Sequence, residues 1–149
     1  MKKSKKIILV SALIVAALLI LVLGMLFYYR EQTFLEILPA DPISAVVQIR
    51  KNGMDHSQNL PENLFSDFLD DLSEFQYKQV TSASGMDSFG SLIYSVEGKH
   101  IEIMFSNERG GSVLINDIDK NGKAPVYKVL GNNGRLEEIF DTYLALANE

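Results

Sequence analysis

Residues 7–29 have the sequence IILVSALIVAALLILVLGMLFYY, the longest apolar run of the chain, and the remaining segments are interpreted relative to it. The run contains no charged residue. At 1.5 Å per residue, a helix of this length extends roughly 34 Å, which is enough to cross a hydrocarbon core of about 30 Å. The run therefore predicts a transmembrane helix.

The charges on either side of this run predict its orientation. Lys2, Lys3, Lys5 and Lys6 precede it, whereas Arg30 is the only basic residue that closely follows it. Short segments rich in lysine and arginine stay on the cytoplasmic side of a membrane. We therefore expect a single-pass protein of the cell membrane, with a cytoplasmic N-terminus and an extracytoplasmic C-terminal domain.

A cleaved secretory signal is the alternative interpretation of the same run. Signal peptides usually have an apolar region of about 7–15 residues, which is shorter than this one. The chain has no cysteine, so a lipid-modified cysteine after the run is excluded. Both the anchor and the cleaved signal would place the rest of the chain outside the cytoplasm.

Composition limits the class of partner. The net charge is −5, but residues 31–149 contain all 19 acidic side chains and 9 basic ones, a net charge of −10. Nucleic acid is an unsuitable partner for such a domain, because binding depends on clustered lysine and arginine. A fold without disulfides outside the cytoplasm favours a bacterial surface protein.

Hydrophobic periodicity predicts the fold of the remaining chain. Residues 60–75 and 135–147 have the apolar spacing of amphipathic helices. Alternating residues and turn signals predict strands at 43–50, 76–82, 91–96, 100–106, 112–118 and 125–130. The order β-α-β-β-β-β-β-α indicates an α+β domain with a mostly antiparallel sheet and two amphipathic helices.

The predicted organisation has four parts. Residues 1–6 form a basic cytoplasmic segment and residues 7–29 the membrane helix. Residues 30–42 form a linker, in which Pro39 and Pro42 stop any continuation of that helix. Residues 43–149 form the extracytoplasmic domain.

One short motif suggests a metal site. Asp117, Asp119 and Asn121, followed by Gly122, match the first half of a calcium-binding loop, in which alternate oxygen side chains surround the ion. The twelfth position of such a loop should be glutamate, but here it is Lys128. The alternative interpretation is a hairpin turn, which favours the same residue types. Ca²⁺ is accordingly the only cofactor that the sequence suggests.

Other candidate residues have ordinary structural explanations. His56 and His100 lack the spacing of a metal site. The acidic face of the first amphipathic helix could bind a cation, although solvent-facing helix surfaces are commonly acidic. Three tyrosines on predicted strands could form an exposed ligand patch, with core packing as the default alternative; they are Tyr77, Tyr94 and Tyr127.

The whole layout resembles small, uncharacterised, single-span extracytoplasmic proteins of Gram-positive bacteria. The shared features are the lysine-rich start and apolar span, a strand ending in Lys51-Asn52-Gly53, the helix NLFSDFLDDLSEF, and the strand APVYKVL before a closing helix. The resemblance is one of pattern and implies no catalytic or cofactor-binding residues.

These observations predict a membrane-anchored, non-enzymatic interaction or accessory domain with a protein partner at the cell surface. A cell-envelope hydrolase or ligand-binding enzyme is one alternative, for which His100, Glu102 and a serine would have to converge. A calcium-stabilised surface domain is another.

Overall fold

The computed structural model describes residues 2–42, 46–80, 86–120, 123–132 and 134–149, with side chains described from Val10 onward. The chain divides into two compact units, Met1–Arg30 and Glu31–Glu149. Each unit is considered by itself below.

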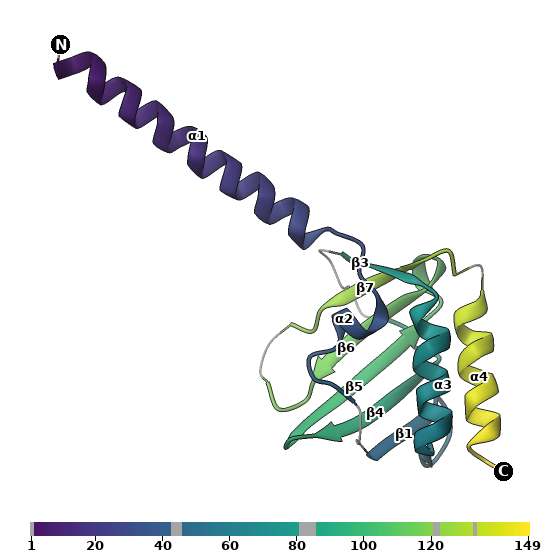
Figure 1. Ribbon diagram of the computed structural model, residues 1–149. Coiled ribbons are helices and arrows are strands. Elements are labelled where there is room, and N and C mark those ends of the chain that lie inside the picture. Colours follow the sequence, from purple (N-terminus) through teal and green to yellow (C-terminus); the bar gives the residue numbers. More distant parts are fainter. Residues whose placement is uncertain (1, 43–45, 81–85, 121–122, 133) are drawn as a thin grey trace. The chain divides into compact units, whose positions relative to one another are not determined.

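The first unit is a single helix, α1 (Lys2–Tyr28). Its segment Val10–Tyr28 is long and apolar enough to span a membrane, and it buries none of its side chains. Large apolar side chains are exposed along the whole of this segment, from Val10 to Tyr28, and Figure 1 shows the helix extending as one continuous coil. A helix that is apolar all round requires an apolar environment, either a protein core or a bilayer. The helix is therefore compatible with a membrane anchor or a signal sequence.

The second unit is built on one seven-stranded sheet with the order β2-β1-β4-β5-β6-β7-β3. Every neighbouring pair is antiparallel. The strands are β1 (Val46–Lys51), β2 (Gln58–Asn59), β3 (Gln76–Val80), β4 (Gly90–Val96), β5 (Lys99–Ser106), β6 (Ser112–Asp117) and β7 (Val126–Leu130). The predicted α+β class is confirmed, and the sheet is open.

Two helices, α3 (Glu62–Ser73) and α4 (Arg135–Leu146), lie side by side against one face of the sheet (Figure 1). Both are amphipathic, as the spacing of their apolar residues predicts. Phe65, Phe68, Leu69 and Leu72 are buried on α3, and Leu136, Ile139, Phe140, Tyr143 and Leu144 are buried on α4.

Aromatic rings fill the space between the helices and the central strands. Phe105 of β5 lies with its ring centroid 5.4 Å from Phe140 of α4 and 6.2 Å from Phe68 of α3. Phe89, just before β4, lies 5.4 Å from Phe140. Offset and edge-on ring pairs at these distances add to the stabilisation that comes from burial alone. This cluster attaches both helices to the sheet.

Residues 31–42, expected to be a linker, contribute to the folded unit. A short helix, α2 (Phe34–Ile37), buries Phe34 and Ile37 in the core. Just before it, the backbone of Gln32 exchanges two hydrogen bonds with Tyr77 on the edge strand β3, at 2.9 and 2.8 Å. The two prolines therefore follow a docked helical turn, whose four residues are too few to show a periodicity.

A smaller difference concerns the short elements. The polar segment 54–59 ends in β2, which has only two residues. A 3₁₀ turn, η1 (Glu108–Gly110), joins β5 to β6. Residues 43–45, predicted to begin the first strand, lie outside the described residues.

Candidate functional site

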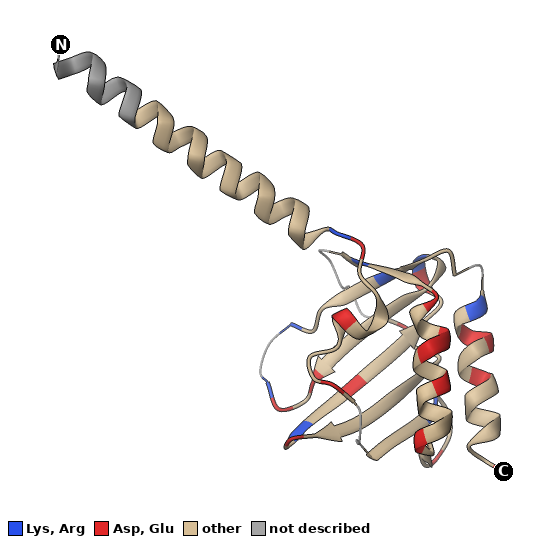
Figure 2. Ribbon diagram, viewed as in Figure 1, with Lys and Arg blue, Asp and Glu red and all other residues tan. Residues whose placement is uncertain are grey.

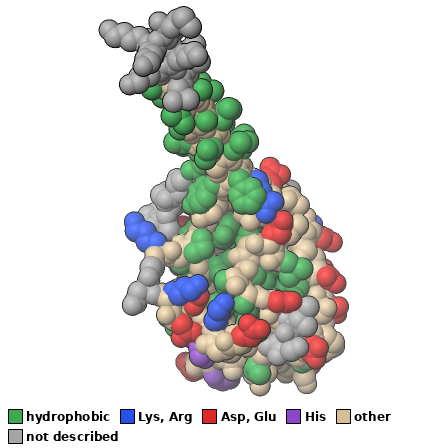
Figure 3. Space-filling model, turned by 60° about the vertical axis from the view of Figure 1, so that its left-hand side comes forward, with side chains coloured by type: hydrophobic (Ala, Val, Ile, Leu, Met, Phe, Trp, Pro, Cys, Tyr) green, Lys and Arg blue, Asp and Glu red, His purple; other side chains and the backbone are tan. Residues whose placement is uncertain are grey.

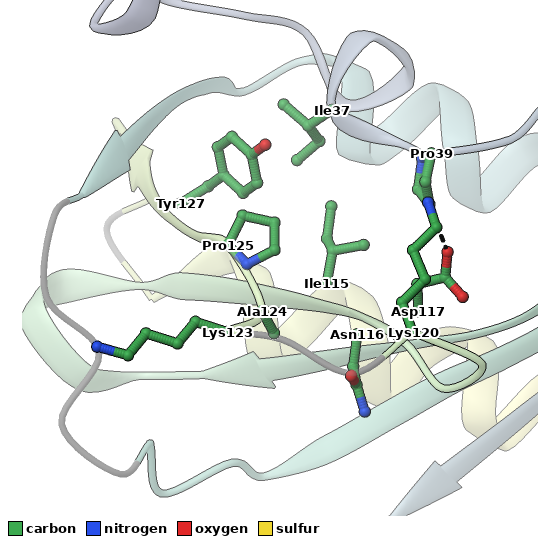
Figure 4. A pocket seen from close by; sticks show the side chains of 10 residues that line it. All are labelled: Ile37, Pro39, Ile115, Asn116, Asp117, Lys120, Lys123, Ala124, Pro125 and Tyr127. Carbon is green, nitrogen blue, oxygen red and sulfur yellow. Dashed lines mark ion pairs between the residues drawn. The ribbon is translucent and has the colours of Figure 1, made fainter.

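A hollow of about 370 Å³ lies on the helix-bearing face of the sheet, beside α2 and the β6–β7 hairpin. Figure 4 shows Ile37, Pro125 and Tyr127 around it, with Asp117 and Lys120 at one side. Its lining residues are Ile37, Pro39, Ile115, Asn116, Asp117, Lys120, Lys123, Ala124, Pro125 and Tyr127.

Strand register explains why an acid and apolar groups share this wall. In β6, Ile115 lies opposite Ile103, and Asp117 lies opposite Ile101. Ile101 and Ile103 are fully buried beneath the helices. Because side chains alternate along a strand, Ile115 and Asp117 project to that same face. Residues 37 and 39 then close the hollow from the other side.

Asp117 is the most unusual group in the hollow. Its side chain is only 12% exposed, and Lys120 Nζ lies 3.2 Å from its Oδ2. Both carboxylate oxygens are inaccessible to water. Within the described part of the chain, neither oxygen accepts a hydrogen bond. The contact with Lys120 is an ion pair whose geometry is not that of a hydrogen bond. A buried carboxylate is costly unless donors satisfy it. The site therefore contains an acceptor with unused hydrogen-bonding capacity.

Asp117 and Asp41 both act on a buried tyrosine near the hollow. Tyr94, on the neighbouring part of the sheet, donates a hydrogen bond from its hydroxyl to the carbonyl oxygen of Ala40 at 3.2 Å. Burial, followed by the negative charges of Asp41 and Asp117, raises the pKa of Tyr94 to about 12. The influence of both carboxylates on this phenol indicates an electronegative region beside residues 40–41.

A second hollow of about 440 Å³ lies along residues 38–42 and α3. It is mainly apolar, with Leu35, Leu38 and Leu69 in its wall, and it includes Asp41 and Asp70. The 38–42 segment thus borders acidic and apolar groups here, and its Pro39 also lines the first hollow.

The surface of the folded unit is predominantly acidic. Figure 2 shows acidic residues, in red, along α3 and near the start of α4. Figure 3 shows apolar side chains at the surface, with basic and acidic side chains beside them. This face therefore combines apolar groups with charges of both signs.

The predicted calcium ligands have separate partners. Asp119 Oδ2 accepts hydrogen bonds from the backbone N–H of His100 at 2.8 Å and lies 3.2 Å from its Nδ1, whereas Asp117 faces Lys120. Asn121 lies outside the described residues. Both contacts use Oδ2 of the carboxylate concerned. The calcium site stays a prediction, which a titration of melting temperature with CaCl₂ would test.

The hydrogen bonds from His100 favour the ionised form of Asp119. They lower the pKa of this carboxyl, the backbone N–H having the largest effect and the imidazole the next. A lowered carboxyl pKa contributes stability above the unfolded-state pKa, and this contribution is lost as the pH falls through the folded-state value.

We expect His100→Ala to raise the pKa of Asp119 only part of the way to its ordinary value, because the backbone N–H is retained. The titration of the Asp119 carboxyl carbon, followed by NMR in the wild type and in this variant, measures the change. A full return to the ordinary value would show that the imidazole, not the backbone, dominates.

The enzyme alternative depends on His100, near the start of β5, whose acidic partner is Asp119, just after β6. Ser95 lies opposite His100 in the strand register, and His100 contacts Asp119. Glu102, two residues along β5, lies opposite Ile93 and Asn116. The side chains of His100 and Asp119 are 56% and 50% exposed. A catalytic triad needs a nucleophile hydrogen-bonded to its base, and among the described residues no such bond joins Ser95 to His100.

The remaining sequence candidates have structural roles in the described part of the chain. Tyr77, Tyr94 and Tyr127 are buried, at 0%, 1% and 8% exposure, so core packing is confirmed and an exposed aromatic patch is wrong. On the acidic face of α3, Asp71 accepts a hydrogen bond from Tyr143 at 2.8 Å. Glu74 pairs with Arg135 at 2.8 Å.

The other members of that acidic set, Asp67 and Asp70, raise the pKa of Tyr143 together with Asp71, after burial as the leading cause. His56 is exposed in the segment between β1 and β2.

The sequence motif identified Asp117 but grouped it with Asp119 and Asn121. Sequence reasoning did not identify Ile37, Pro39 or Lys120 as residues of the site. The position of Asp117, two residues after Ile115 in a predicted strand, could have indicated that its side chain faces the core, because alternate residues of a strand lie on the same face.

Comparison of the chain with protein-family models, with curated proteins and with solved structures gave no match.

Proposed function

We propose that this chain is a membrane-anchored, extracytoplasmic, non-enzymatic interaction domain. In this proposal, α1 crosses the cell membrane once with the N-terminus in the cytoplasm. Residues 31–149 then form an acidic domain at the outer surface that binds a protein partner.

The proposal depends mainly on one observation: a long helical segment without charged residues precedes a separate folded unit. The 19-residue segment Val10–Tyr28 buries nothing within its unit, so bilayer insertion is the environment that satisfies its side chains. The four lysines before it, against a single arginine close after it, support the orientation. An acidic module held at a surface is suited to capturing a basic partner.

Topology is tested by adding protease to wall-stripped bacterial cells that produce the chain with a C-terminal epitope. We expect the epitope to be digested and the intact, uncleaved chain to remain in the membrane fraction before protease is added. Protection of the epitope in unbroken cells would overturn the orientation. A shortened, soluble chain would instead identify residues 7–29 as a cleaved signal.

Partner binding is tested by in-cell photo-crosslinking from single positions. A photoreactive residue at Lys123, at the edge of the hollow, is expected to give a defined adduct. The matched control is His56, which is exposed beside β2 at the opposite edge of the sheet from β3 and β7. Absence of adducts from Lys123, His56 and further positions around the domain would contradict an interaction role.

A further inference from the structure

We propose that the hollow beside α2 binds a lysine or arginine side chain of the protein partner. The positive group of that side chain would replace Lys120 at Asp117, and its aliphatic stem would lie against Ile37, Ile115 and Pro125. This inference depends on the proposed interaction function and names the chemistry that the partner must present.

The first argument is the unused capacity of Asp117. Its two oxygens are buried, and within the described residues they receive one ion-pair contact, from Lys120 at 3.2 Å, and no hydrogen bond. An ammonium group has three donors and a guanidinium group five, so either can satisfy a carboxylate fully. A ligand of this chemistry gains hydrogen bonds that the free protein lacks.

The second argument is that Lys120 can be displaced easily. It lies three residues after Asp117 on the hairpin turn, and its side chain is 71% exposed. The lysine itself is solvated and loses little by returning to water, whereas the buried carboxylate needs another cation in its place. Lys120 can therefore move into water while a partner's cation takes its place.

The third argument is the shape and polarity of the wall. The hollow measures about 370 Å³, and apolar atoms of Ile37, Ile115 and Pro125 line it beside the carboxylate (Figure 4). Lysine and arginine side chains pack their methylene stems on apolar surfaces while the charged end reaches a polar group. A wall of this kind next to a buried acid matches both parts of such a side chain.

The fourth argument is the sign of the surrounding charge. Asp41 and Asp117 both act on Tyr94, and the folded unit has a net charge of −10. The net charge of the unit favours encounter with cations, and at the hollow itself Asp117 is the acidic group beside Lys120 and Lys123. An anionic ligand would have Lys120 and Lys123 as partners, but it would have to approach the buried charge of Asp117.

The test uses the full chain in detergent micelles, with the isoleucine methyl groups labelled for NMR. The probes are N-acetyl-lysine methylamide and N-acetyl-arginine methylamide. N-acetyl-norleucine methylamide is the matched control, since it has an aliphatic side chain without charge. We expect saturable shifts of the Ile37 and Ile115 methyl signals with the charged probes, and no saturable shift with norleucine. The buried Ile103 methyl signal serves as an internal reference for the fold.

Two variants are expected to change the affinity for the lysine probe in opposite directions. Asp117→Asn is expected to weaken binding of the lysine probe by about tenfold or more, the loss typical of one charge-assisted hydrogen bond. Lys120→Gln is expected to strengthen binding by at least about threefold, because it removes the competing cation. If Asp117→Asn disturbs the Ile103 signal, the Lys120→Gln result decides alone.

Several outcomes would overturn this proposal. They are equal shifts with norleucine, weaker binding in Lys120→Gln, or preferential binding of N-acetyl-glutamate methylamide, which would identify an anion site. Photo-crosslinks that form around the domain but never from Lys123 would retain the interaction function and reject this pocket. Absence of crosslinks everywhere would instead reject the interaction function itself.

Discussion

The double variant Leu18→Arg, Leu19→Arg is expected to lose membrane insertion. Both residues lie at the middle of Val10–Tyr28 and are 58% and 57% exposed. On the insertion scale, replacing leucine by arginine at the centre of a spanning helix costs about 3–4 kcal/mol per residue, so the pair costs about 7 kcal/mol. A penalty of this size exceeds what tilting or snorkelling recovers at the bilayer centre.

The measurement is the fraction of the full chain that sediments with membranes after alkaline carbonate washing. The matched control is Leu18→Ile, Leu19→Val, which keeps the helix apolar and should sediment like the wild type. The double-arginine chain should appear in the soluble or aggregated fraction. If it stayed in the membrane, attachment would have to come from residues outside the centre of α1.

The second large effect is expected from Phe105→Ala, which should lower the free energy of unfolding of residues 31–149 by about 3–5 kcal/mol. Phe105 is fully buried, and its ring lies near those of Phe68, Phe89 and Phe140. Removing it leaves a cavity between the sheet and both helices, and the surrounding rings cannot all collapse into it. A typical domain has only about 5–15 kcal/mol of stability, so much of the total would be lost.

Urea unfolding of the full chain in micelles, followed by tyrosine fluorescence, measures this change, because the chain has 6 tyrosines and no tryptophan. Met104→Ala is the matched control. Met104 is the preceding residue on β5, lies on the other side of the sheet and is partly exposed, so its loss should cost about 1 kcal/mol or less. Equal effects of the two substitutions would contradict the central position of the aromatic cluster.

The candidate site lies apart from this cluster, since none of the four rings lines the hollow. The helices cover the central strands through Phe105 and its neighbours, whereas α2 and residues 38–42 cover the end of the sheet that holds Asp117. The hollow lies beside the β6–β7 hairpin, between the part of the sheet covered by α3 and α4 and the part covered by α2 and residues 38–42. Site and core are therefore separable, and Asp117 can be altered without removing any of the packed rings.

Much of the fold could be predicted from local sequence pattern. The spacing of apolar residues in α3 and α4 determines which helix face is buried, and alternation in β5 determines which side chains face the helices. These patterns need only neighbouring residues, because secondary structure repeats over two to four positions. The apolar helix α1 is predictable for the same reason, since its length and composition are local properties.

The linker illustrates where local pattern is insufficient. Phe34 and Ile37 are buried only because the folded sheet and helices provide a surface for a four-residue helix. The pairing of Gln32 with Tyr77 joins positions far apart in the chain. Neither contact produces a periodicity that a sequence could reveal.

The sequence by itself determined the apolar span, the acidic domain without cysteine, and the succession of strands and amphipathic helices. Composition and periodicity depend only on the order of residues along the chain. Only the tertiary structure decided the surroundings of Asp117. The sequence motif grouped it with Asp119 and Asn121. In the structure Asp117 lines a hollow with Ile37 and Pro39 because of its register in β6, whereas Asp119 accepts a hydrogen bond from His100. Register and packing bring together residues that are distant in sequence, and that is why the electrostatics of the hollow depend on the fold.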